Sequence, residues 1–139
     1  MKYLLNFSLV LLLIFSIGCG KKVWPEPDAE EEKFSLHIED VVLEDTCLYL
    51  TAEIRGNQRN LAGLILELEK SEIPCPGCPF LVTESFDPDL DSPEVHLQNG
   101  LVTIAYCLID PMKYYRVRLT GRNVFTEIQD VRSNVIDVF

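Results

Sequence analysis

The chain has 139 residues, of which 12 are lysine or arginine and 22 are aspartate or glutamate, so its formal net charge is −10 at pH 7. A chain of this length can bury one hydrophobic core and form a single domain. The acidic balance disfavours nucleic acid and anionic lipid headgroups as partners, because binding to either needs clustered cations.

The N-terminal residues are the most informative part of the sequence. Lys2 precedes a mainly apolar run over residues 4–17, which ends at Gly18 and Cys19. A spanning helix needs about 20 apolar residues, so the run is too short for one and is typical of a secretory signal. These residues resemble the signal of bacterial lipoproteins, which implies that residues 1–18 are removed and that Cys19 is acylated with palmitate. Ser16 stands where that family usually has leucine, and cleavage as an ordinary secreted protein near Cys19 is the alternative.

The residues after the signal predict a tether. Residues 1–18 contain one lysine and no acid, so the remaining 121 residues carry a net charge of −11. Residues 19–33 are charged and contain prolines, a composition typical of an extended linker. We therefore expect attachment to a membrane through lipid on Cys19. An aspartate in place of Gly20 would resemble an inner-membrane retention signal, so in a bacterium with two membranes the lipoprotein resemblance implies the outer membrane, facing the periplasm.

From Phe34 onwards the sequence alternates between apolar and polar residues in short runs, which predicts strands with one buried face. The predicted strands cover residues 34–38, 46–54, 64–68, 95–98, 101–109, 114–119 and 134–139, with 80–86 as a further short candidate. Asn99-Gly100 separates two of these runs and predicts a two-residue hairpin turn, which places Val95 opposite Ile104 and Leu97 opposite Val102. About seven short strands joined by polar turns predict one antiparallel β-sandwich over residues 34–139.

The segment from Ile109 to Leu119 resembles the end of strand E and the start of strand F in fibronectin type III domains. The resemblance rests on the spacing of Ile109, Pro111, Tyr115, Val117 and Leu119. It implies that Tyr115 folds back over this corner, next to Pro111, and that its hydroxyl bonds the upstream backbone. The second strand lacks the tryptophan of the family, and the Asn99-Gly100 hairpin also suits an immunoglobulin constant-type strand order, which is the alternative.

Four cysteines follow Cys19, and an even number in an exported protein predicts disulfides with three possible connectivities: the four are Cys47, Cys75, Cys78 and Cys107. In a sandwich, the strands 46–54 and 101–109 are antiparallel neighbours. Matching their apolar faces pairs Leu48 with Tyr106, Leu50 with Ile104 and Ala52 with Val102. The same register places Cys47 opposite Cys107, so we predict the disulfides Cys47–Cys107 and Cys75–Cys78.

Cys75-Pro76-Gly77-Cys78 is the one candidate for chemistry. A C-x-x-C motif can lower a cysteine pKa and form a reversible disulfide, which would make the protein a thiol-disulfide oxidoreductase. Prolines within and around the motif exclude the helix that usually activates such a site, so we expect a structural disulfide that pins a surface loop. A four-cysteine zinc site would need Cys47 and Cys107 to reach this loop, which their own pairing opposes.

The other residue patterns do not complete a metal-binding or catalytic motif. Asp87, Asp89 and Asp91 are spaced like the start of a calcium loop, but the glycine and glutamate that complete such a loop are missing. We therefore expect an acidic surface loop, and His37 and His96 are expected at surface or edge positions. The sequence predicts no catalytic residue, no cofactor and no metal ligand.

The predicted function is a non-catalytic binding or structural module of the cell envelope. Its expected contact surfaces for an envelope protein partner are the region 75–91 and the sheet edges, which can accept a partner strand. The alternatives are a periplasmic oxidoreductase that uses Cys75 and Cys78, and an accessory subunit of an envelope assembly. A sandwich fold alone does not decide among them, because such folds host many functions.

Overall fold

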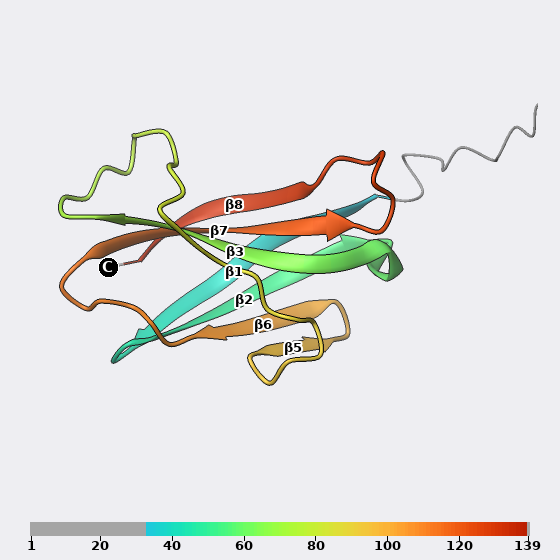
Figure 1. The fold of residues 1–139 in the computed structure, drawn as a ribbon, viewed down its shortest axis with the longest axis horizontal. Helices are drawn as coiled ribbons and strands as arrows, with labels where there is room; N and C mark the ends of the chain where they lie inside the picture. The colour runs from blue at the N-terminus through green and yellow to red at the C-terminus, as the bar shows by residue number, and fades with distance from the viewer. Residues whose placement is uncertain (1–32, 139) are drawn as a thin grey trace, which may run out of the picture.

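The structure is a computed structural model that describes residues 33–138, and these residues form an all-β sandwich (Figure 1). The expected signal peptide, the expected lipidation residue Cys19 and all of the expected tether except Lys33 lie outside the described residues.

The sandwich consists of two antiparallel sheets of four strands each. The first has the order β1-β2-β6-β5 and the second has the order β4-β3-β7-β8. The elements are β1 (Phe34–Glu44), β2 (Cys47–Gly56), the 3-10 helix η1 (Gln58–Asn60), β3 (Leu61–Ser71), β4 (Glu84–Phe86), β5 (Val95–Gln98), β6 (Leu101–Tyr106), β7 (Tyr114–Asn123) and β8 (Val131–Val138). The predicted antiparallel sandwich is confirmed, with eight strands where about seven were expected.

The core lies between the sheets and is built by the alternation seen in the sequence. On β2 the buried residues are Leu48, Leu50, Ala52 and Ile54, and on β3 they are Leu64, Leu66 and Leu68. Successive side chains of a strand point to opposite faces, so each strand gives every second residue to the core. Burial of these side chains from water is the main stabilising contribution to the fold.

The predicted strand registers in the first sheet are confirmed. Leu48 pairs with Tyr106, Leu50 with Ile104 and Ala52 with Val102 between β2 and β6. Between β5 and β6, Val95 pairs with Ile104 and Leu97 with Val102. Val95 is buried, whereas Leu97 is exposed because β5 is a short edge strand.

The β5–β6 turn has the backbone conformation that its sequence predicts. Asn99 and Gly100 have φ angles of 53° and 81°, the left-handed pair of a two-residue hairpin. A Cβ atom on Gly100 would also lie 2.6 Å from Nε2 of Gln58 and would push this amide away from the Ile54 carbonyl to which it donates, but the left-handed φ angle is the main reason for glycine here.

The predicted strand 101–109 is too long, because β6 ends at Tyr106. After Tyr106 the chain leaves the sheet: the N–H of Ile109 donates to the Thr46 carbonyl at 3.0 Å. The next N–H, that of Asp110, donates to the hydroxyl of the buried Tyr115 at 3.0 Å. This is the kind of upstream backbone contact that the resemblance implied for Tyr115, and the neighbouring Pro111 is exposed.

Several strands extend further than predicted: β1 continues to Glu44 through an irregularity between Ile38 and Asp40, β7 reaches Asn123, and β8 begins at Val131. The amide of Asn134 on β8 joins the two sheets at this irregularity. Its Oδ1 accepts a hydrogen bond from the Ile38 N–H at 2.8 Å, and its Nδ2 donates to the Ile38 carbonyl at 3.2 Å. The Asn134 side chain thus bonds both backbone polar groups of Ile38.

Both predicted disulfides are present. Cys47 and Cys107 are bonded with a Cα–Cα distance of 3.8 Å, and Cys75 and Cys78 with a Cα–Cα distance of 5.4 Å. The first closes a sequence separation of 60 residues and the second a separation of three.

The two disulfides should differ in their effect on stability. In the chain-entropy description, loss of Cys47–Cys107 in a double alanine variant should lower the free energy of unfolding by roughly 4 kcal/mol. Loss of Cys75–Cys78 should cost less than about 2 kcal/mol, because the closed loop is so short. Urea unfolding of the two double variants measures this difference, and equal losses would contradict it.

Candidate functional site: the Cys75–Cys78 loop

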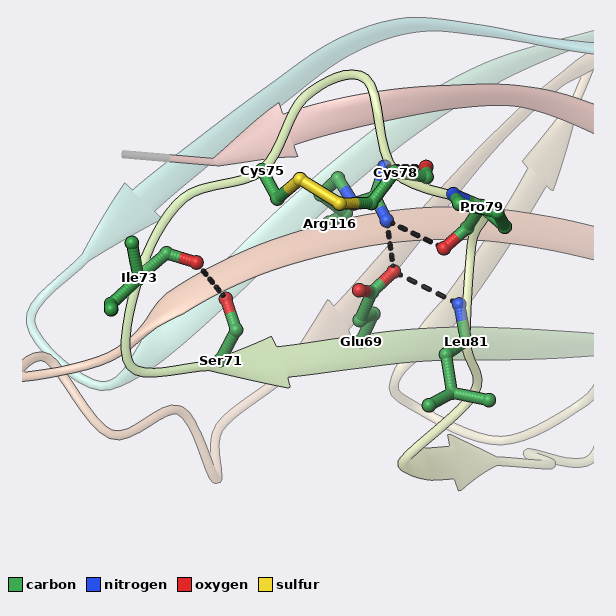
Figure 2. The surroundings of a disulfide bond; sticks show 8 residues. All are labelled: Glu69, Ser71, Ile73, Cys75, Cys78, Pro79, Leu81 and Arg116. Atoms are coloured by element: carbon green, nitrogen blue, oxygen red, sulfur yellow. Dashed lines mark hydrogen bonds and ion pairs between the residues drawn. A yellow bond between two sulfur atoms is a disulfide. The ribbon is translucent and has the colours of Figure 1, made fainter.

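The connection between β3 and β4, residues 72–83, contains the C-x-x-C motif and is called here the disulfide loop. It arches over Arg116 on β7 (Figure 2). Within the motif the N–H of Cys78 donates to the Cys75 carbonyl at 3.1 Å, so the four residues form a turn closed by the disulfide. The loop therefore lies over the face of the second sheet that points away from the core.

Beneath the disulfide loop lies a layer of charged side chains that join β3 to β7. Glu67 and Glu69 stand directly opposite Arg118 and Arg116 in the register of the two strands. Arg116 Nη2 lies 2.5 Å from Glu69 Oε2, and Arg118 Nε lies 2.7 Å from Glu67 Oε2. All four side chains are largely buried, so within each pair the attraction between the two charges compensates for the water that both have lost.

Arg116 and Glu69 also hold the backbone of the disulfide loop (Figure 2). Arg116 donates from Nη1 to the Cys78 carbonyl at 2.8 Å and from Nη2 to the Pro79 carbonyl at 3.0 Å. The N–H of Leu81 donates to Glu69 Oε2 at 3.0 Å. The Arg116–Glu69 ion pair thus holds the loop backbone at Cys78, Pro79 and Leu81. Charge-assisted hydrogen bonds of this kind are stronger than neutral ones.

Thr83 fastens the end of the disulfide loop beside β3. Its N–H donates to the Leu68 carbonyl at 2.9 Å, and its hydroxyl oxygen accepts from the Lys70 N–H at 2.8 Å. These contacts continue the sheet pairing that begins in β4 at Glu84. The predicted short strand 80–86 is therefore limited to its last three residues, and residues 80–83 belong to the loop.

Phe80 packs on the two arginines. The centre of its ring lies 4.5 Å from Cζ of Arg118 and 5.8 Å from Cζ of Arg116. Guanidinium groups stack favourably on aromatic faces, which adds an apolar contact to the polar ones. Phe80 is half-buried, whereas residues 72–79 are exposed.

The chemistry available at the motif follows from its surroundings. Cys75 and Cys78 flank a turn at Pro76 and Gly77, and neither lies at the start of a helix. The nearest positive charge is Arg116, but Glu69 is bound to the same guanidinium. The cleft beside the motif, lined among others by Pro74, Cys75 and Tyr114, has a volume of about 10 Å³, which is room for one water molecule at most.

Lys70 is the best-defined titrating group near the loop. Its Nζ lies 3.6 Å from Glu84 Oε1, 3.9 Å from Asp110 Oδ2 and 5.9 Å from the centre of the Tyr115 ring. Burial alone would lower the pKa of the Lys70 ammonium, but the Tyr115 hydroxyl and the two carboxylates outweigh it and raise the pKa. Lys70 is therefore a permanent cation that links β3 to β4 and to the β6–β7 connection.

The remaining sequence-predicted positions lie apart from the loop. Asp87 pairs with Arg122 at 2.6 Å, Asp89 and Asp91 are exposed, and so are His37 and His96. Among residues 33–138 no group of three or more histidine, cysteine, aspartate or glutamate side chains is placed to hold a metal ion. The same residues contain no helix with the length and apolar character needed to cross a bilayer.

Sequence reasoning missed the residues that shape the site. The sequence patterns did not connect the glutamates of β3 with the arginines of β7 or with Phe80. The available signal was the alternation of opposite charges, acids on β3 and arginines on β7. Only the β3–β7 register shows which acid meets which arginine.

Comparison with known proteins identified no relative: no protein-family model matches this chain, and no curated protein does.

Removal of the Arg116 charge should loosen the disulfide loop. In Arg116→Gln, two loop carbonyls lose a donor and Glu69 is left largely buried without its partner, which should cost about 2 kcal/mol of stability. Hydrogen exchange at the Leu81 amide should become faster, because Glu69 no longer holds that N–H in place. The control is Arg132→Gln, which changes an exposed arginine on β8. Unchanged protection of the Leu81 amide in Arg116→Gln would contradict this role.

Proposed function

We propose that the protein is an exported lipoprotein that is acylated on Cys19, tethered by residues 19–33, and used as a non-catalytic binding module of the cell envelope. Its membrane contact is the lipid, and its partners are proteins. The resemblance of residues 1–19 to lipoprotein signals, with Gly20 after the cysteine, favours the outer membrane and a domain that faces the periplasm.

The pairing of the cysteines is the observation that carries this proposal. Two disulfides use all four cysteines of the described residues. Disulfides of this kind persist in oxidising compartments outside the cytosol, which supports export. Cys19 is the fifth cysteine of the chain, and none of these four is available to form a disulfide with it. A cysteine whose sulfur is acylated must be free of a disulfide in this way.

The construction of the disulfide loop supports binding more than catalysis. Its backbone is held by Arg116, Glu69 and the disulfide, so exposed residues are presented in one conformation. A surface that is ordered before binding loses less conformational entropy when a partner docks. Of the four edge strands, β4 and β5 are only three and four residues long and offer little backbone to a partner strand. The edges β1 and β8 have 11 and 8 residues, and Asn134 of β8 bonds the β1 backbone at Ile38.

The family relation of the domain is part of the proposal. The hydrogen bond between the Asp110 N–H and the Tyr115 hydroxyl supports the likeness to fibronectin type III domains. The order β1-β2-β6-β5 matches the A-B-E-D sheet of immunoglobulin constant-type domains. We therefore assign the domain to the broad group of immunoglobulin-like sandwiches, which includes both types.

Metabolic labelling tests the anchor. The full chain, produced in a bacterium that is fed labelled palmitate, should incorporate the label, and Cys19→Ala should abolish it because the acylated sulfur is gone. Cys75→Ala is the matched control and should keep the label. Absence of label from the wild-type protein would overturn the lipoprotein assignment.

A thiol-disulfide oxidoreductase is the second candidate, and one observation favours it. The Cys75–Cys78 disulfide is exposed and lies beside the Arg116 guanidinium, and a nearby cation stabilises a thiolate. Against it, the motif has no helix behind it and Glu69 offsets the charge of Arg116.

Redox measurements separate the two candidates. A structural Cys75–Cys78 bond should have a reduction potential below about −300 mV, and the protein should not accelerate the reduction of insulin. A potential in the range of about −120 to −270 mV, with insulin reduction that is lost in Cys75→Ala, would establish the oxidoreductase instead.

A further inference from the structure

Exposed apolar side chains gather on two loops of the sandwich. Among the described residues, the four most exposed large hydrophobic side chains are Met112 (84%), Ile73 (77%), Leu108 (75%) and Leu81 (68%). Ile73 and Leu81 belong to the disulfide loop, and Leu108 and Met112 belong to the β6–β7 connection, residues 107–113. Single exposed apolar residues are ordinary, but four of this size on two loops that the Glu72–Lys113 ion pair joins make these loops the candidate interaction surface of the domain.

The two loops and the β1–β2 turn, residues 45–46, are joined into one surface, which we call the distal end. The Ile109 N–H bonds the Thr46 carbonyl, and Lys113 forms an ion pair with Glu72. The chain enters the domain at the opposite end, where the Lys33 carbonyl accepts from the Asn57 N–H at 3.0 Å (Figure 1). The 11 residues of β3 separate the two ends by about 33 Å.

The charges of the distal end are arranged around its apolar residues. Residues 73–82 contain no charged side chain. Next to them Glu72 pairs with Lys113, and Asp110 pairs with Lys70. The exposed carboxylates of Glu44, the last residue of β1, and of Asp45 in the β1–β2 turn add negative charge at the margin. The surface is thus an uncharged apolar centre with an acidic margin.

We infer that the distal end docks onto another protein of the cell envelope, through an apolar pocket that is bordered by basic side chains. The inference rests on the proposed function and adds the surface and the kind of partner to it. Basic side chains around the pocket would complement Glu44 and Asp45, and the apolar pocket would bury Ile73, Leu81 and Met112.

Two other occupants fit the distal end less well. A second copy of the chain would bring the same acidic margins together, which like charges oppose. A bilayer would leave the polar backbone groups of the irregular disulfide loop without hydrogen-bond partners, and anionic headgroups would repel the margin. A protein pocket can supply both the hydrogen bonds and the cations.

Site-specific cross-linking in living cells tests the inference. The full chain is produced in its host with a photoreactive amino acid in place of Leu81 or Met112. The matched control is position 124, because Val124 is 54% exposed but lies at the end where the chain enters, its N–H bonded to the Asn60 carbonyl. We expect one protein adduct of the same size from positions 81 and 112, at least about tenfold more abundant than any adduct from position 124.

Charge changes then test the chemistry of the surface. With the photoreactive group at position 81, Met112→Asp should reduce the adduct at least about tenfold, and Glu44→Lys combined with Asp45→Lys should reduce it as well. Val124→Asp should leave it unchanged. All of these sites are exposed, and an unchanged melting temperature shows that each variant is folded.

The outcomes separate this inference from the proposed function. Equal adducts from positions 81 and 124, adducts to lipid only, or adducts of two copies of the chain would each overturn docking by the distal end. Palmitate labelling of the same cells reports on the anchor independently. Label without the expected adduct removes only the docking inference, whereas unlabelled wild-type protein removes the lipoprotein assignment.

Discussion

The pairing of β2 with β6 is the constraint on which the rest of the structure depends. This register sends Leu50 and Ile104 into the core together, and it brings Cys47 and Cys107 within bonding distance. Side chains alternate between the two faces of a strand, so a slip by one residue would turn the apolar set outward and separate the cysteines. The core and the disulfide therefore select the same register, and each reinforces the other.

The consequences of this register reach the end of the domain. The disulfide lies where β6 leaves the sheet, and just beyond it the chain turns so that Asp110 meets the hydroxyl of Tyr115. Tyr115 is the second residue of β7, and its burial places that strand against the core. The start of β7 then lies beside the end of β3, where the disulfide loop begins.

Neighbouring strands of the second sheet, β3 and β7, are joined by ion pairs, whereas β2 of the first sheet is joined to the segment after β6 by a disulfide. Arg116 and Glu69 meet because β3 and β7 are in register, and together they hold the backbone of the disulfide loop. Largely buried ion pairs contribute little net stability compared with apolar packing, but they can specify one arrangement. In this domain the arrangement is a rigid loop that displays Ile73 and Leu81 to solvent. The four most exposed large hydrophobic side chains of residues 33–138 thus lie on loops away from the point at which the chain enters.

Local patterns in the sequence were sufficient for the sandwich class, the Asn99-Gly100 hairpin and the existence of the strands, though not for all of their bounds, because alternation and turn chemistry act over a few residues. Local patterns also predicted both disulfides. Matching the apolar faces of β2 and β6 places Cys47 opposite Cys107, which leaves Cys75 and Cys78 to pair with each other. The end of β6 could not be predicted, because Ile109 is apolar in sequence but leaves the sheet to bond Thr46. The charged layer under the disulfide loop was equally out of reach: Glu69 and Arg116 are 47 residues apart, and only the assembled sheet brings them together. Long-range register and loop placement depend on contacts between distant segments, so the distal end and its exposed apolar residues were decided by the tertiary structure.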